Sequence, residues 1–241
     1  MIPMTLGVTV SGEYAQFECQ VMDLAVRATK FDIGHDFQHL KRVRDMAVRC
    51  ADSTGQDYDH EALLAAAWLH DVVNVAKDSP DRKNASRMSA ELAEELIRDS
   101  KIDMTDCQIA IMRGAILSHS FSARIEPRTI VACAVRDADR LDSMGVIGFM
   151  RMVAVSVSMG RKLVAPADPL CTERKPNDHE YTIDHYFTKI MHLGKDMKTP
   201  LGKQLAAERL DQMATMIKNL GGELTGDGTS SIVSASYPIG V

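Results

Sequence analysis

A segment that is apolar on nearly every side constrains this chain more than any other feature. Residues 59–73 read DHEALLAAAWLHDVV, and no polar side chain interrupts the run from Ala62 to Leu69. A helix with an apolar surface all round has to be covered on every side, so it belongs at the centre of a larger assembly. The segment therefore predicts a central buried helix surrounded by other helices.

Apolar residues recur at helical spacing along most of the chain, as Leu40, Val43 and Ala47 do in one stripe. This periodicity predicts an all-α bundle of about nine helices. We expect them at residues 13–30, 36–53, 59–73, 84–100, 104–118, 127–142, 145–158, 182–193 and 201–220. Pro127 would occupy the first turn of its helix, and Gly221-Gly222 would end the last one.

No internal repeat or shift in composition marks a boundary, so we expect one domain over residues 1–241. The tail at residues 222–241 differs in composition from the rest. Residues 5–9 and 230–237 alternate weakly in polarity, which is compatible with a short β pairing of the two termini or with a flexible tail.

The charge balance excludes several classes of partner. The chain has 28 Lys and Arg against 33 Asp and Glu, for a net charge of −5, so no global field attracts nucleic acid or an anionic membrane. No run reaches the ~18 apolar residues of a membrane span, and the N-terminal sequence lacks the regions of a signal peptide. None of the five cysteines forms a C-x-x-C pair, which favours reduced thiols. We therefore expect a cytoplasmic protein.

Four side chains with metal-binding chemistry lie in or beside the predicted helices: His39, His70, Asp71 and Asp139. An ionised aspartate at the end of an apolar helix is costly unless it is paired or bound to a metal. Two imidazoles and two carboxylates suit a divalent ion such as Mn²⁺, Fe²⁺, Ni²⁺, Co²⁺ or Zn²⁺, whereas Mg²⁺ prefers oxygen ligands. The alternative is that these residues only cap helices and form surface ion pairs.

The blocks around these residues carry a family resemblance. They read, in order, HDFQHLKRVRDMA, LAAAWLHDVV, KDSPDRKNASRMSAELAEEL, LSHSFSARIEPRTIVACAVRDADRLDSMGVIGFMR and TIDHYFTKI. Together they resemble a bacterial stand-alone branch of the HD-domain superfamily of metal-dependent phosphohydrolases, over a core at residues 22–215. The resemblance implies an HD-domain helical bundle in which His39, His70, Asp71 and Asp139 hold the metal.

Five further side chains are candidates for contact with substrate. His35 begins the HDFQH block and would contact phosphate or orient a metal ligand. The alternative is that it is only a polar residue at the start of a helix. His119 would bind phosphate, donate a proton or ligate a second metal, unless it only ends a helix. The cations Lys77, Arg82 and Arg87 follow the HD dipeptide and suit a phosphate group, unless they are simply solvated.

Some members of the superfamily carry a carboxylate shortly after the HD dipeptide that helps to activate water. In this chain Asn74 stands in that stretch, and an amide cannot take a proton from water. Asp78 would have to replace that carboxylate, or the metal would have to suffice.

Residues and resemblance together predict a metal-dependent phosphohydrolase that cleaves a nucleotide or another small phosphate ester. Its catalytic candidates are His119, Lys77 and His35. Similarity to nucleotide-cleaving members favours (deoxy)nucleoside triphosphate pyrophosphohydrolysis, with 5′-phosphomonoesterase activity as the next candidate. An HD-type di-iron oxygenase and a non-catalytic nucleotide-binding regulatory module are the alternatives. The apolar segment at residues 144–159 would be core or the face of a homodimer.

Overall fold

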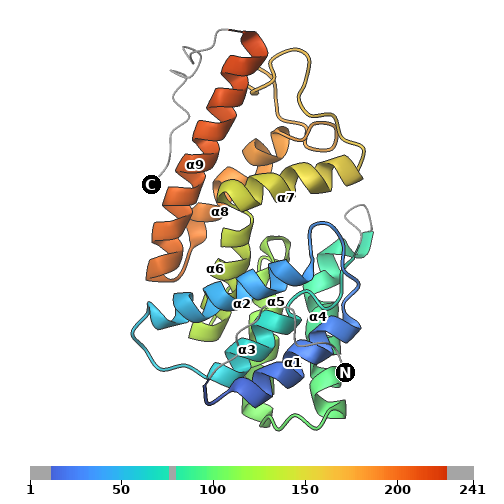
Figure 1. Cartoon of the computed structure of the whole chain (residues 1–241), viewed down its shortest axis with the longest axis vertical. Helices are drawn as coiled ribbons and strands as arrows, with labels where there is room; N and C mark the ends of the chain where they lie inside the picture. Colours follow the sequence, from blue (N-terminus) through green and yellow to red (C-terminus); the bar gives the residue numbers. More distant parts are fainter. Residues whose placement is uncertain (1–11, 76–79, 227–241) are drawn as a thin grey trace. The chain divides into compact units, whose positions relative to one another are not determined.

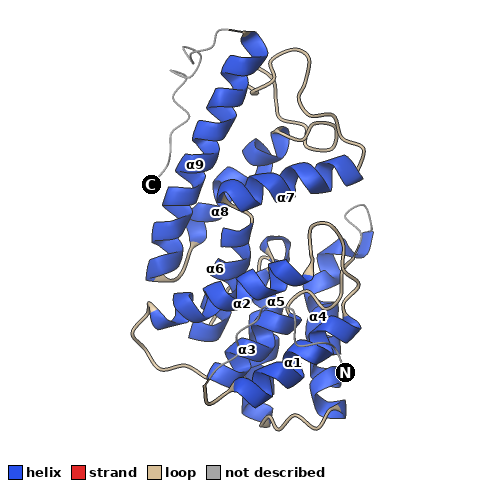
Figure 2. Cartoon of the chain, in the orientation of Figure 1, coloured by secondary structure: helices blue, strands red, loops and turns tan. Residues whose placement is uncertain are grey.

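The computed structural model describes residues 12–75 and 80–226. All the secondary-structure elements in these ranges are helices (Figure 2). The all-α prediction is therefore confirmed. An isolated β-bridge joins Lys162 to Tyr181. The predicted pairing of residues 5–9 with residues 230–237 lies outside the described residues. Within the described ranges no single helix is long and apolar enough to cross a membrane, although the helices Ile130–Asp142 and Gly145–Ser158, taken together as a bent pair, pass that test.

The chain divides into two compact units, Met1–Asp139 and Arg140–Val241, and the single domain over residues 1–241 stays a prediction. The first unit contains α1 (Ala15–Ala28), α2 (Phe37–Asp52), α3 (His60–Leu69), α4 (Ala85–Asp99), α5 (Asp106–His119) and most of α6 (Ile130–Asp142). The second contains α7 (Gly145–Ser158), a π-helical turn (Tyr186–Ile190), α8 (Met191–Leu193) and α9 (Pro200–Thr225) (Figure 1).

The buried centre of the first unit is α3, as the apolar segment predicts. Every side chain from Ala62 to Leu69 is buried, and the helix packs against α1, α2 and α5. It ends at Leu69, so the expectation that it runs to residue 73 is wrong. The His70 ring donates a hydrogen bond from Nδ1 to the carbonyl oxygen of Ala67. If the helix continued, this oxygen would accept from the backbone amide of Asp71 instead. His70 and Asp71 therefore lie at the exit of α3.

A buried carboxylate joins three of these helices. Glu18 of α1 is only 2% exposed. It accepts a hydrogen bond of 3.0 Å from Nε1 of Trp68 in α3 and forms an ion pair with Arg44 of α2. Because one side chain satisfies partners on two other helices, it fixes how α1 and α2 lie on the central helix.

Capping side chains set where two other helices begin. The carboxylate of Asp36 accepts a hydrogen bond of 2.7 Å from the amide of His39, which places His39 in the first turn of α2. In the same way the hydroxyl of Thr129 accepts from the amide of Ala132 at 3.1 Å, and α6 begins at Ile130. The expectation that Pro127 opens α6 is therefore wrong, because the threonine cap lies two residues later.

In the second unit, α7 packs against α9, and α9 runs further than its two glycines suggested. The helix continues through Gly221 and Gly222 and ends at Thr225, before Gly226 with its φ of +76°. A side chain at Gly221 would place its Cβ 2.5 Å from Cδ1 of Leu170. The glycine therefore serves a close helix–loop contact, and the expectation that it ends the helix is wrong.

The segment between α7 and the π-helical turn is held together by two aspartates. The carboxylate of Asp168 accepts hydrogen bonds from the backbone amides of three residues: Thr172, Glu173 and Arg174. Arg174 in turn forms a two-pronged ion pair with the buried Asp184, at 2.5 and 2.7 Å. In this segment, side-chain carboxylates accept hydrogen bonds from backbone amides, which in a helix or strand would bond to backbone carbonyls.

We expect Glu18→Ala to lower the free energy of unfolding by about 3 kcal/mol, because it leaves Arg44 and the Trp68 indole without their buried partner. Urea unfolding followed by circular dichroism measures the change. Asp23→Ala is the matched control on the same helix, since the exposed pair of Asp23 with Arg27 should contribute less than about 1 kcal/mol. An equal loss in both variants would contradict a role for Glu18 as the link between helices.

Asp184 also predicts a response to acid. Burial favours its neutral form, but Arg174 and the amide of Asn177 outweigh burial and hold the pKa of Asp184 below its ordinary value. A lowered carboxyl pKa contributes stability above pH ~4 that is lost as the pH falls towards the folded-state value. We expect Asp184→Asn to unfold more easily at pH 7 and to lose less stability on acidification. The exposed Glu173→Gln should leave the pH profile of unfolding unchanged, and identical profiles for Asp184→Asn and wild type would refute the assignment.

Candidate metal centre

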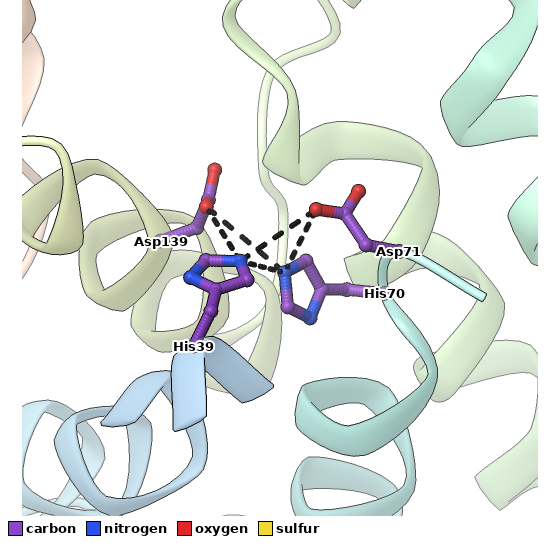
Figure 3. A group of neighbouring side chains, drawn as sticks. All are labelled: His39, His70, Asp71 and Asp139. Carbon is purple, nitrogen blue, oxygen red and sulfur yellow. Dashed lines mark hydrogen bonds and ion pairs between the residues drawn. The ribbon is translucent and has the colours of Figure 1, made fainter. Parts of the chain in front are cut away.

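The first unit brings together the four side chains in which the sequence predicted a metal site. His39 comes from the first turn of α2, His70 and Asp71 from the exit of α3, and Asp139 from α6. One donor atom from each residue lies within 4.8 Å of all the others. Figure 3 shows the two imidazole rings and the two carboxylates turned towards a common point.

Individual distances within this cluster are close to uniform. Nε2 of His39 lies 3.6 Å from Oδ2 of Asp71 and 3.7 Å from Oδ1 of Asp139. Nε2 of His70 lies 3.4 Å from the same Asp71 oxygen and 3.3 Å from Nε2 of His39. Both imidazoles are fully buried, whereas the two carboxylates keep about a fifth of their surface exposed. The cluster therefore has a buried nitrogen side and a more open oxygen side.

The orientation of His70 suits a metal ligand. Its Nδ1 lies 2.8 Å from the carbonyl oxygen of Ala67, and a carbonyl can only accept, so Nδ1 must carry the hydrogen. Nε2 is then the nitrogen that faces the carboxylates. A ring held in this way by a partner on its far side is the usual arrangement for a metal-binding histidine.

The two carboxylates of the cluster need positive charge close by. Burial would favour neutral carboxyls, but the neighbouring His70 and the other imidazoles hold the pKa values of Asp71 and Asp139 below the ordinary range. In return, against the effect of its own burial, the two carboxylates raise the pKa of His70 to about 9. The proton on His70 offsets part of the negative charge of these two partly exposed carboxylates. A divalent cation would balance the same charges, so the four residues fit such an ion.

Two further histidines lie against Asp71, as the sequence predicted for residues near the centre. Nε2 of His119 is 3.4 Å from Oδ1 of Asp71, and its Nδ1 donates to the carbonyl oxygen of Ile116 at 2.6 Å. Nε2 of His35 is 3.9 Å from Oδ2 of Asp71. The two oxygens of one carboxylate therefore face different histidines. The catalytic roles given to His35 and His119 stay predictions.

The basic candidates are placed less fully. Lys77 lies outside the described residues, as does Asp78. Arg82 belongs to a short 3₁₀ turn at Pro80–Asn84, and its side chain is not described. Arg87 is exposed on α4, with Nε 4.0 Å from Glu91 of the next turn. The phosphate contacts assigned to these three cations stay predictions.

One carboxylate near the centre was missed by the sequence analysis. Asp32 lies in the loop before α2 and accepts a hydrogen bond of 3.0 Å from Nδ1 of His35. Asn74, which replaces the carboxylate expected in its stretch, donates from Nδ2 to the other oxygen of Asp32 at 2.7 Å. The local signal was the spacing D-x-G-H, because an aspartate commonly accepts from amides two and three residues ahead. The link to Asn74 spans 42 residues and has no local signal.

Comparison with known proteins agrees with this arrangement. Residues 36–144 match the family model of the HD domain. The uncharacterised protein YpgQ of Bacillus subtilis (strain 168) is 26% identical over 193 residues, which cover 80% of this chain and 86% of that protein. A crystal structure from Lactobacillus plantarum is 27% identical and superposes with a TM-score of 0.69, covering 88% of this chain and 98% of the other.

Two more crystal structures share the fold. YpgQ of Bacillus subtilis in complex with ADP superposes with a TM-score of 0.63 at 24% identity, covering 89% of this chain and 99% of the other. An HD-superfamily hydrolase from Bacillus thuringiensis gives a TM-score of 0.59 at 24% identity, covering 87% and 97%. The region that matches the HD-domain family model, residues 36–144, contains all four clustered side chains.

Proposed function

We propose that this protein is a metal-dependent phosphohydrolase that acts on a nucleotide, with His39, His70, Asp71 and Asp139 as the metal ligands. The observation that carries the proposal is the convergence of four donor atoms within 4.8 Å of one another. An HD-superfamily hydrolase fold with such a His/Asp cluster supports a metal-dependent phosphohydrolase in general. The identity of the substrate and of the reaction goes beyond this general class and is our proposal.

The protein supplies the ligands and the surroundings. A divalent cation in the cluster would act as a Lewis acid on a phosphoryl oxygen and would lower the pKa of water bound there. His39 and His70 would bind it as neutral rings, because a ligating imidazole must offer a lone pair. Since both rings are fully buried, access to the centre is from the side of the partly exposed Asp71 and Asp139.

The flanking residues are assigned to the substrate. His119 lies beside Oδ1 of Asp71 and would donate a hydrogen bond from Nε2 to the phosphoryl group or its leaving oxygen when its ring carries a hydrogen on both nitrogens. Lys77, Arg82 and Arg87 would neutralise the remaining phosphate charges. His35 lies beside Oδ2 of the same carboxylate, on the side that faces His39 and His70.

The crystal complex of YpgQ with ADP supports a nucleotide as the substrate class. Within this class we propose nucleoside triphosphate pyrophosphohydrolysis. Water attacks the α-phosphorus, the bond from that phosphorus to its bridging oxygen breaks, and pyrophosphate leaves with the bonding electrons. The products are a nucleoside monophosphate and pyrophosphate. The expected cytoplasmic location and the homodimer stay predictions.

We expect Asp71→Asn to abolish both metal retention and catalysis, because the amide removes a charge that faces four imidazoles. Equilibrium dialysis should find one metal ion per wild-type chain and none per variant, and kcat/KM should fall at least about 100-fold. Asp45→Asn is the matched control, since Asp45 lies on the outside of α2 with Lys41 and Arg44. Unchanged turnover in Asp71→Asn would contradict the proposal, as would two irons per chain with oxygen consumption.

A panel of nucleoside tri-, di- and monophosphates with Mn²⁺, analysed by phosphorus NMR, tests the reaction. We expect pyrophosphate from triphosphates. Lys77→Ala and Arg82→Ala should each raise KM about tenfold through the loss of a charge-assisted contact, while Arg27→Ala, an exposed control on α1, should not. Release of orthophosphate alone would refute the pyrophosphohydrolase and leave the general phosphohydrolase standing.

A further inference from the structure

The carboxylate of Asp32 accepts hydrogen bonds both from the backbone of its own loop and from the ring of His35, which lies beside the metal cluster. Oδ1 accepts hydrogen bonds of 2.7 Å from the backbone amides of Gly34 and His35, and one of 3.0 Å from Nδ1 of the His35 ring. Oδ2 accepts from the side-chain amide of Asn74 at 2.7 Å. The four donors leave the carboxylate in a fixed orientation, although half of its surface is exposed.

This arrangement decides which nitrogen of His35 carries hydrogen. The backbone amides of Gly34 and His35 and the side-chain NH₂ of Asn74 can only donate, so both oxygens of Asp32 act as acceptors. An ionised carboxylate can only accept hydrogen bonds, so Nδ1 of His35 must be the donor. In the neutral ring Nε2 is then left with a lone pair.

Nε2 of His35 points to the metal cluster without belonging to it. It lies 3.9 Å from Oδ2 of Asp71, the oxygen that also faces His39 and His70. The rings of His35 and His39 meet edge to face, with centroids 5.8 Å apart, and the His35 side chain is 13% exposed. A small molecule bound between the cluster and solvent would come within reach of this nitrogen.

The lone pair limits what that molecule can be. A phosphoryl oxygen has no hydrogen to donate and would be repelled by the lone pair of Nε2, whereas a water molecule can donate one. We propose that Asp32 is a positioning residue that fixes the ring of His35, so that Nε2 accepts a hydrogen bond from the water that attacks the phosphoryl group. Asn74 holds Asp32 in place for this task. The inference rests on the proposed phosphohydrolase function.

A purely structural role for Asp32 is the competing explanation, because the same carboxylate shapes the turn that leads into α2. The two roles differ in one respect. If Asp32 acts through His35, removing Asp32 costs activity only while the His35 ring is present. If it acts only through the turn, the cost is the same with or without the ring.

The test combines a double-mutant cycle with a direct measurement on the ring. We compare wild type with Asp32→Ala, His35→Ala and the double variant, all full length and loaded with Mn²⁺. Asp32→Ala should lower kcat about 10- to 100-fold, with a change in metal affinity of less than about twofold. In the His35→Ala background the same substitution should cost less than about twofold. Asp23→Ala is the matched control in the same unit, and an equal cost in both backgrounds would overturn the proposal.

Long-range ¹H–¹⁵N NMR of the ¹⁵N-histidine-labelled full chain, loaded with diamagnetic Zn²⁺, reports the tautomer of His35 without any turnover. We expect the Nδ1–H form in the wild type, its loss in Asp32→Ala and its return in Asp32→Asn, which keeps an oxygen acceptor. An unchanged tautomer in Asp32→Ala would overturn the proposal even if that variant were slow. Absence of turnover in the wild type would instead overturn the proposed function, while the NMR signal would still decide whether Asp32 sets the ring.

Discussion

The fold of the first unit has to accommodate two aspartates with lowered pKa values beside two buried imidazoles. Asp71 and Asp139 carry negative charge next to an apolar core, so they need positive charge close by. A proton on His70 supplies part of it, and a cation held by both imidazoles and both carboxylates would supply the rest. Such a cation site needs α2, α3 and α6 to hold these side chains to within about 0.5 Å of the required geometry.

That register depends on ordinary packing and capping far from the chemistry. α3 has no polar face, so it must be enclosed, and enclosure fixes where its last residue emerges. Glu18 ties α1 and α2 to this helix through Trp68 and Arg44. The Asp36 and Thr129 caps set the first residues of α2 and α6, and hence the helical phase at which His39 and Asp139 face inwards. The positions of the metal-cluster side chains are thus determined by where α2 and α6 begin and where α3 ends.

Much of this was predictable from the sequence, because periodicity and residue chemistry are local properties. The central helix, the all-α class and the convergence of His39, His70, Asp71 and Asp139 all followed from local patterns and family resemblance. The end of α3 and the start of α6 were missed although the hydrogen bonds that set them are local, whereas two other features depended on distant partners. Gly221 lies inside α9 because Leu170 packs on it, and Asp32 lies near the centre because Asn74 and His35 hold it there. The contact of Gly221 with Leu170 and that of Asp32 with Asn74 leave no trace in the spacing of residues along the chain.

The rings of His70 and His119 differ from that of His35 in how they are held. Both donate from Nδ1 to a main-chain carbonyl three residues earlier, at Ala67 and Ile116, whereas His35 donates to a side chain. A carbonyl belongs to every residue type, so no single substitution at position 67 or 116 deletes the partner, provided that the helix still forms. These two orientations are therefore buffered against mutational drift. The His35 orientation is not, because a single substitution at Asp32 removes the side-chain acceptor of its Nδ1.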